Sequence, residues 1–401
     1  MSFTNGRRDV TLVAAAKGVS WLGDEVALVA LTLHTQSSGV GAAGVAALLI
    51  ANTLPIVLLS GPVGRLVDRH DNRLLLAASS IVQLLACAAL AFVPSQPVIL
   101  ALLAVLGAGQ AVNSATWSAL VPAMVVPEDL PRAIGLTQTA TTFAGVVAPA
   151  LGGLLYGGFG TRVPLLVDAA SFGAVLVAAL AVHTRRTVSA TKHAHGGVAI
   201  VARDPLLRAL LGLLALFVLL GCMVNVVDVF LVRETLGASP TWYGITGACY
   251  SVGALTGAVF SGRLLRGTTA LARGLVGSCV VLALGLAAMG GVPSVAWLLP
   301  LGLITGCANG ALNVAQGSLI MGRTAPDERG RVAAVLSGVA SGTQLIAFGV
   351  GGALTSVLDP RAVFALAGGL GLLAPVLLGR TVLRAARFPQ AADSQVMETV
   401  S

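Results

Sequence analysis

The chain has 401 residues, of which 56% are hydrophobic and only 10% are charged, and its mean hydropathy is +0.92. A soluble domain carries roughly 25% charged residues, so this composition excludes a protein whose whole surface faces water. The formal charge of +8 would suggest a nucleic-acid partner in a soluble protein, but the basic residues here lie in short gaps between apolar runs. A membrane protein that does not bind nucleic acid is therefore predicted.

Apolar runs long enough to cross a bilayer, which takes about 20 residues, follow one another along the whole chain. The first six begin near Val10, Gly41, Leu74, Val98, Gly135 and Pro164. The next six begin near Leu206, Trp242, Gly274, Val295, Val332 and Ala362. The pattern predicts an all-α integral membrane protein with twelve transmembrane helices. No cleavage site for a secretory leader is evident, so the first run is expected to remain as a span.

Lys and Arg residues favour cytoplasmic loops, and here they gather before the first span, in the even-numbered gaps and after the last span. This distribution predicts a multi-pass protein of a bacterial cytoplasmic membrane with both termini in the cytoplasm. The five cysteines all lie inside apolar runs, where they act as small hydrophobic residues. No pair of them has the spacing of metal ligands or of a redox motif.

A polar stretch from residue 184 to residue 205 divides the chain into two halves that resemble each other. A shift of 199 residues pairs Gly107 with Gly306 and Gln110 with Asn309. We therefore predict an N-terminal six-helix half (1–183), a cytoplasmic linker (184–205), a C-terminal six-helix half (206–383) and a cytoplasmic tail (384–401).

The loop Gly64-Arg65-Leu66-Val67-Asp68-Arg69-His70-Asp71-Asn72-Arg73, between the second and third spans, resembles the loop signature of the major facilitator superfamily. Two positions depart from that signature, because Asp71 stands where Gly is usual and Asn72 where a basic residue is usual. The resemblance implies the major facilitator fold and a cytoplasmic gate formed by Gly64, Asp68, Arg69, Arg73, Arg329 and Arg331. The alternative is that Arg69 and Arg73 only mark the cytoplasmic side.

A second stretch, in the fifth span, resembles the antiporter motif of the same family through Gly145, Pro149, Gly152 and Gly153, with Ala148 where Gly is usual. This resemblance favours export over import. The alternative is an ordinary seam of small residues that lets two helices pack closely. The loop 127–133 and Gly23-Asp24 add a resemblance to enterobactin exporters and macrolide-efflux permeases.

Polar residues interrupt the first, fourth, seventh and tenth spans, which by the resemblance line a central cavity. They are Lys17, Ser20, Gln110, Asn113, Asn225, Asn309, Asn313 and Gln316, and the aromatic rings of Trp21 and Trp117 are expected to line the same cavity. Polar groups that face lipid are costly, so we predict that these side chains face a wet cavity or one another.

Three acidic residues in the spans, Asp24, Glu25 and Asp228, are predicted to bind protons or substrate. Ionised Asp24 would cost roughly 3 kcal/mol near the middle of a span, so its proton is expected to bind and leave as the hydration of the cavity changes. The alternative is a structural ion pair with Lys17, about 10 Å away along the helix. Asp168, near the start of the sixth span, is interpreted as an end-of-helix or packing residue.

These features predict a secondary active transporter that exports a small molecule, such as a drug, siderophore or secondary metabolite, by proton antiport with alternating access. An importer or facilitator of the same fold is the alternative. A membrane sensor is disfavoured because the loops are too short for an output domain, and an enzyme because no catalytic constellation is present. No cofactor is expected, and His193 and His195 lack a third metal ligand. The expected partners are the substrate, protons and the lipid bilayer, with the chain as a monomer.

Overall fold

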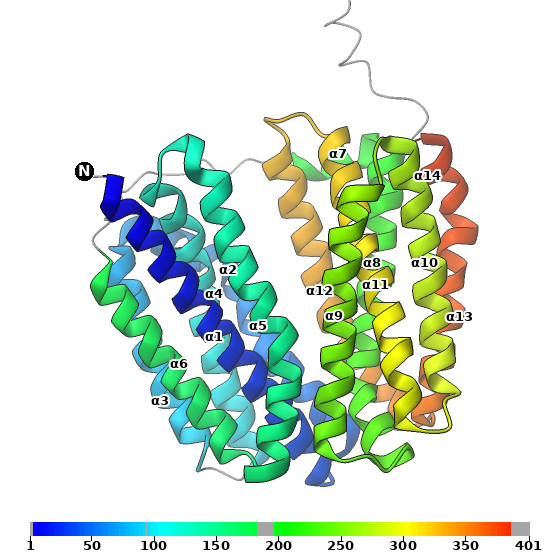
Figure 1. Ribbon diagram of the computed structural model, residues 1–401, viewed down its shortest axis with the longest axis horizontal. Helices are drawn as coiled ribbons and strands as arrows, with labels where there is room; N and C mark the ends of the chain where they lie inside the picture. The colour runs from blue at the N-terminus through cyan, green and yellow to red at the C-terminus, as the bar shows by residue number, and fades with distance from the viewer. Residues whose placement is uncertain (1–2, 93–94, 183–195, 386–401) are drawn as a thin grey trace, which may run out of the picture. The chain divides into compact units, whose positions relative to one another are not determined.

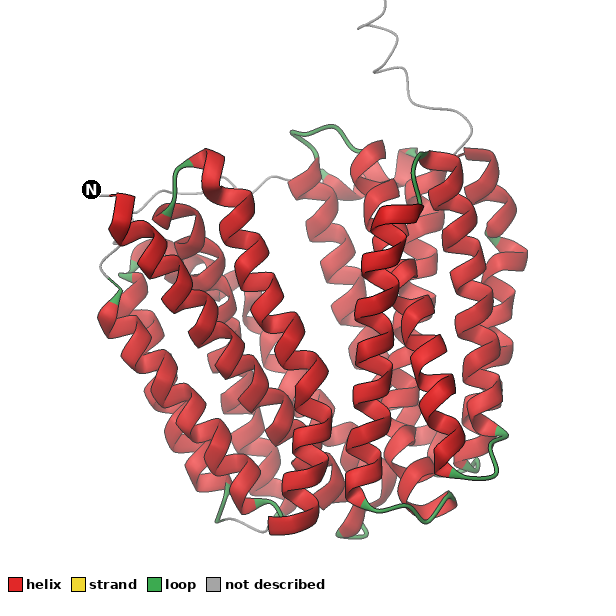
Figure 2. Ribbon diagram, viewed as in Figure 1, coloured by secondary structure: helices red, strands yellow, loops and turns green. Residues whose placement is uncertain are grey.

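A computed structural model describes residues 3–92, 95–182 and 196–385, and every regular element in these ranges is helical (Figure 2). The long helices in these ranges are α1 (Phe3–Ser37), α2 (Gly41–Arg69), α3 (Asn72–Leu90), α4 (Gln96–Met124), α5 (Leu130–Phe159), α6 (Arg162–Ala181), α8 (Pro205–Phe230), α9 (Pro240–Leu264), α10 (Thr268–Gly290), α11 (Leu298–Arg323), α12 (Arg329–Thr355) and α13 (Pro360–Leu377). The shorter elements are α7 (Gly197–Arg203), α14 (Gly379–Ala385), two 3-10 turns (Pro127–Asp129 and Val295–Trp297) and a π-helical turn (Leu231–Thr235).

Ten of the described helices are long and apolar enough to cross a membrane. The other two long helices are α1, which carries Lys17, Asp24 and Glu25, and α9, which is rich in Gly, Ser, Thr and Tyr. The prediction of an all-α membrane protein is confirmed. In these two helices, polar or small residues therefore interrupt the apolar stretch.

Helix ends are set by residues with specific backbone roles. The carboxylate of Asp71 accepts a hydrogen bond from the Arg73 amide at 2.8 Å, and Asp359 does the same for the Arg361 amide at 2.8 Å. Both are N-caps, which satisfy an amide that the first turn leaves free. Asp71, one of the two departures from the family signature, therefore begins α3.

By packing, the chain forms two compact units, and each is described separately. The first unit comprises Met1–Lys192, Val226–Ala248 and Phe348–Ser356. Within it α1 lies along α5 and α6, α2 packs on α4, and α3 packs on α4 and α6 (Figure 1). A methyl group added at Gly107 of α4 would overlap the carbonyl oxygen of Asn52 on α2. Glycine is therefore what allows these two backbones to approach.

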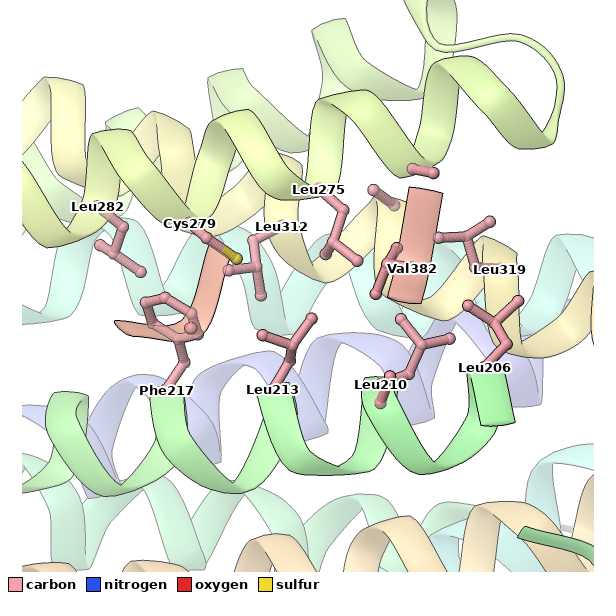
Figure 3. Packing of buried hydrophobic residues seen from close by; sticks show 14 of the residues in the cluster. Leu206, Leu210, Leu213, Phe217, Leu275, Cys279, Leu282, Leu312, Leu319 and Val382 are labelled. Atoms are coloured by element: carbon pink, nitrogen blue, oxygen red, sulfur yellow. The ribbon is translucent and has the colours of Figure 1, made fainter. Parts of the chain in front are cut away.

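The second unit comprises His193–Asn225, Cys249–Ala347 and Val357–Ser401. In it α10 packs on α11 and α13. Figure 3 shows its core, where buried side chains of α8, α10, α11 and α14 meet, among them Leu210, Leu275 and Val382. A methyl group added at Gly306 of α11 would overlap the carbonyl oxygen of Tyr250 on α9. Gly107 and Gly306, which the 199-residue shift pairs, thus have the same packing role in separate units.

The predicted linker is partly helical. Residues 183–195, which include His193 and His195, lie outside the described residues, but α7 occupies much of the remainder. Val201 of α7 packs with Leu207 and Val332, so the apolar end of this segment joins the core of the second unit. Likewise α14 ends within the predicted tail, at Ala385. The four predicted domain ranges otherwise stay a prediction.

Candidate functional site

A buried polar group lies inside the first unit, where α1, α3, α4 and α6 meet. Asp24 on α1 is half-buried, and the side-chain amide of Gln110 on α4 donates a hydrogen bond to its Oδ2 at 3.3 Å. The packing of these helices therefore brings Asp24, predicted to bind protons or substrate, together with Gln110, predicted to line the cavity. An amide donor stabilises a carboxylate without neutralising its charge.

Asp168 on α6 is the second carboxyl of this group and is only 1% exposed. Its Oδ1 accepts a hydrogen bond from the Ser171 hydroxyl at 3.1 Å, and its Oδ2 accepts one from the Cys87 thiol at 3.2 Å. A methyl group added at Gly23 would lie 2.5 Å from Asp168 Oδ1. The carboxyl of Asp168 therefore packs directly against the backbone of α1, one residue before Asp24.

Asp168 is the functional candidate that sequence reasoning missed, because its place near the start of a span suggested a helix-end role. It does pack, as expected, but it packs among polar groups inside the bundle. Gly23, directly before Asp24, was the available signal. A glycine at that position makes room for a group on a neighbouring helix.

Among the residues that the structure describes, none of Asp24, Glu25 and Asp168 forms an ion pair. Lys17 is half-buried and lies seven residues before Asp24 on α1. It forms no ion pair with Asp24, so the alternative of a structural ion pair is not supported. An ionised carboxyl that is buried without a cation is costly. Such an arrangement can gain and lose protons or attract a cation.

Two predicted cavity residues of α4 are buried between neighbouring helices, and their place in a cavity stays a prediction. Asn113 is 7% exposed, donates to Gln83 Oε1 at 2.6 Å and accepts from the Ser79 hydroxyl at 2.5 Å. Trp117 is 4% exposed within an apolar cluster with Leu76. Both lie on the side of α4 that faces α3, where an amide finds partners and an indole finds apolar contacts.

On α1, Ser20 is half-buried, and Trp21 is 38% exposed. The indole Nε1 of Trp21 would lie 3.7 Å from a methyl group added at Gly145 of α5, so it lies beside the predicted antiporter motif.

The rest of that motif forms close helix contacts within the first unit. A methyl group at Gly152 would clash with Val29 of α1, and one at Gly153 would clash with Gly244, in the part of α9 that belongs to this unit. A methyl group at Gly247 would lie 3.0 Å from the ring of Pro149. These contacts fit the packing-seam alternative, and an antiporter role stays a prediction.

Asp228 also belongs to the first unit and is half-buried. Glu25 on α1 is likewise half-buried. Asn225 is exposed and belongs to the second unit.

The polar residues of α11 that were predicted to line the cavity, Asn309, Asn313 and Gln316, differ in their burial and partners. Asn313 is exposed and donates to Asn309 Oδ1 at 2.7 Å on the same helix. Gln316 is 4% exposed and donates to the carbonyl of Leu210 on α8 at 2.8 Å. The amide of Gln316 thus bonds a neighbouring helix in the core of the second unit, and its place in a cavity stays a prediction.

The predicted gate residues fall into both units. In the first unit, Arg73 donates to the carbonyls of Ala179 and Leu180, so it covers the C-terminal end of α6, whose dipole favours a cation. Asp68 is half-buried, and Arg69 is exposed. A methyl group at Gly64 would meet open space.

In the second unit, Arg331 lies 3.6 Å from Glu328 and 3.8 Å from Asp327, and Arg329 donates to the carbonyls of Thr324 and Met321. Docking of Asp68 near these two arginines stays a prediction.

The family model described as Major Facilitator Superfamily matches residues 13–233 and 213–398. The chain belongs to the major facilitator superfamily. Members of this family are transporters, so the chain is a multi-pass membrane transporter of a small molecule and is not an enzyme. No cluster of three potential metal ligands occurs within the described ranges.

Relatives and solved structures agree with this assignment. A macrolide efflux protein A of Enterococcus faecalis is 24% identical over 55% of this chain and 73% of its own length. An uncharacterized MFS-type transporter, y4rN, of Sinorhizobium fredii is 27% identical over 82% of each chain. A bacterial homologue of the iron transporter ferroportin, in an inward-facing state, has a TM-score of 0.72 at 17% identity, over 97% of this chain and 100% of its own. The nucleoside transporter NupG has a TM-score of 0.70 at 11% identity, over 95% of this chain and 99% of its own, so the likeness to solved structures concerns the fold.

Proposed function

We propose that the chain exports a small molecule in exchange for protons, and that Asp24 is the group that carries the exchanged proton. The observation that carries this proposal is that Asp24, a half-buried residue inside the bundle, has its carboxyl bonded by Gln110 and unpaired with any cation of the described chain. Ionisable groups inside membrane spans are functional by default because they are costly to keep. A group that is partly exposed can still exchange its proton with water.

Coupling follows from competition for one site. Protonated Asp24 is neutral and suits the bundle interior, whereas ionised Asp24 attracts a cationic or hydrogen-bonding cargo. Proton uptake on one side of the membrane then favours release of cargo there. Loss of the proton on the other side restores the affinity.

Export is supported by the macrolide efflux relatives and by the resemblance of the fifth span to the antiporter motif. For the cargo we propose a moderately apolar molecule that is neutral or carries one positive charge, because the predicted cavity residues offer carboxylates and amides. The chain is expected to act as a monomer in a bacterial cytoplasmic membrane with both termini inside, since the basic residues gather in the loops on that side.

Proton-driven uptake into everted membrane vesicles tests the proposal, with labelled erythromycin as the probe because macrolides are the cargo class suggested by the efflux relatives. Wild-type vesicles should accumulate the probe when energised, and an uncoupler should abolish the accumulation. Asp24→Asn, which keeps the shape but cannot ionise, should lower uncoupler-sensitive uptake to the level of vesicles without the transporter.

Asp359→Asn is the matched control, because it also removes one carboxylate but keeps an N-capping side chain outside the spans. It should transport as the wild type does. Uptake that resists both the uncoupler and Asp24→Asn would refute proton coupling. Accumulation in intact cells in place of everted vesicles would favour the importer.

A further inference from the structure

We propose that Asp168 and Asp24 form one proton-sharing pair across the contact between α1 and α6. This inference rests on the proposed function of Asp24 and adds a residue that neither the family signature nor the cavity prediction includes. Asp168 is a positioning residue in this proposal, because it acts on the cargo site only through Asp24.

The first step of the argument is contact. Asp168 Oδ1 lies 2.5 Å from where a side chain at Gly23 would begin, so α1 and α6 touch at the carboxyl itself. Ser171 occupies the same contact, since its hydroxyl is also 2.5 Å from that point. Because Gly23 precedes Asp24 in the same helical turn, the two carboxyls belong to one local environment.

The second step is the difference in access. Asp168 is 1% exposed, whereas Asp24 is half-buried. A proton on Asp168 therefore exchanges with the outside through movement of α1, or through Asp24. The pair therefore has one partly exposed member, Asp24, and one fully buried member, Asp168.

The third step is electrostatic. Asp168 bonds Cys87 from α3 and Ser171 from its own helix, and α1 meets it at Gly23, directly before Asp24 and Glu25 in the chain. The titratable groups of α5, Arg132 and Tyr156, lie toward the ends of that helix. The group facing Asp24 from α4 is the neutral amide of Gln110. No cation is among them, so two negative charges in this place would repel each other without compensation. The pair should therefore keep one proton over a pH range in which either carboxyl alone would lose it.

This arrangement gives Asp168 a definite task. If it shares a proton with Asp24, then this pair of carboxyls carries at most one negative charge while the proton is held. The contact at Gly23 also ties the protonation of Asp168 to the position of the middle of α1, which is the helix that carries Asp24, Glu25 and Trp21.

Infrared titration of the purified transporter in lipid nanodiscs tests the inference without any cargo, because protonated carboxyl groups absorb in a window that carboxylates do not. The absorbance of the two carboxyls is obtained by subtracting the spectrum of the double variant Asp24→Asn, Asp168→Asn from that of the wild type. We expect the wild type to retain a protonated carboxyl to a pH at least about one unit above that found in either single variant. Thr116→Val, which removes a buried hydroxyl bonded to its own helix, should titrate as the wild type does.

The proposal is overturned if the most alkaline loss of absorbance in the wild type coincides with that of one single variant, because the two carboxyls would then titrate independently. Should Asp168→Asn not fold, the comparison of wild type with Asp24→Asn and with Gly23→Ala decides the matter. Gly23→Ala keeps both carboxyls but displaces Asp168, so it should lower the alkaline midpoint. An unchanged midpoint in both variants rejects the pair.

The vesicle assay separates the two proposals. Loss of coupling in Asp24→Asn with independent titration of the two carboxyls leaves the proposed function standing and removes the pair. Full coupled uptake in Asp24→Asn removes the proposed function, whatever the infrared titration shows.

Discussion

The helices α4 and α11 occupy matching places in two separate units, yet they differ in chemistry. Each has a glycine, Gly107 or Gly306, at which the backbone of a neighbouring helix comes too close for any side chain. One turn later α4 presents Gln110, which reaches Asp24 on α1, whereas the matching Asn309 of α11 bonds Asn313 of its own helix. The comparison shows that the repeat preserves the positions needed for packing and leaves the polar positions free to diverge.

The largest expected effect tests the shared part of this comparison. Gly107→Ala and Gly306→Ala should each destabilise the protein by about 3 kcal/mol, because the added methyl group meets a backbone carbonyl that cannot move aside. Thermal aggregation of the solubilised protein should begin about 5 °C or more below the wild type. Gly135→Ala and Gly277→Ala, at helix positions with open space, should leave the transition unchanged or raise it.

If only one of Gly107→Ala and Gly306→Ala destabilises the protein, the packing roles of the two glycines are not equivalent, and the repeat does not extend to this contact.

The second prediction concerns an ion pair of the second unit. Arg323 Nε lies 2.6 Å from Asp204 Oδ2, and Asp204 also accepts hydrogen bonds from the first amides of α8. Arg323→Ala should cost about 2 kcal/mol, since it leaves a largely buried carboxylate without its cation. Asp327→Ala, which breaks the exposed contact with Arg331, should cost less than about 0.5 kcal/mol. Equal losses of thermal stability in the two variants would contradict this prediction, because the buried ion pair would then contribute no more than the exposed one.

The third prediction tests the divergent part of the comparison. Gln110→Leu removes the hydrogen bond to Asp24 and should lower the rate of uncoupler-sensitive uptake about tenfold, which corresponds to about 1.4 kcal/mol. Asn309→Leu breaks a bond within α11 and should reduce that rate by less than about threefold. A larger effect from Asn309→Leu would place the coupling chemistry in the second unit.

The smallest expected effect concerns the aspartate N-cap that begins one helix in each unit. Asp71→Ala and Asp359→Ala should each lower stability by about 1 kcal/mol, because each removes an N-cap, and the corresponding Asn variants should retain most of it. Differential scanning fluorimetry of the four variants measures this. If the Asn variants lose as much stability as the Ala variants, the charge of the aspartate stabilises the helix, and its capping hydrogen bond does not.

The sequence predicted the helical fold well because lipid imposes a strong and simple demand on composition. Runs of apolar residues and the distribution of Arg were sufficient to predict a helical membrane protein, and one loop motif indicated the family. The same signals could not distinguish polar residues that face water from polar residues that bond one another. Asn113, Gln316 and Gln110 are all amide side chains within apolar stretches, so the sequence does not distinguish them. The partners of Asn113 and Gln316, Gln83 and the carbonyl of Leu210, lie on other helices whose rotation the sequence does not specify.

Asp168 shows the converse limit. Its proposed role depends on a contact with Gly23, which lies on the first helix of the chain. The glycine indicates that some group packs there, but nothing near it in the sequence identifies that group as Asp168. Cys87 was interpreted as a small hydrophobic residue, and it is buried as expected, but its thiol also donates to Asp168. Polar contacts such as these can be identified only from the packing of α1, α3 and α6 in the structure.

Proton flux during transport tests the central role of Asp24 most directly. The purified protein is placed in liposomes that contain a pH-sensitive dye, and an erythromycin gradient is imposed in the absence of any proton gradient. The account predicts that wild-type protein moves protons against the direction of the drug and that Asp24→Asn moves none. Proton movement of equal size in Asp24→Asn and wild type would contradict it.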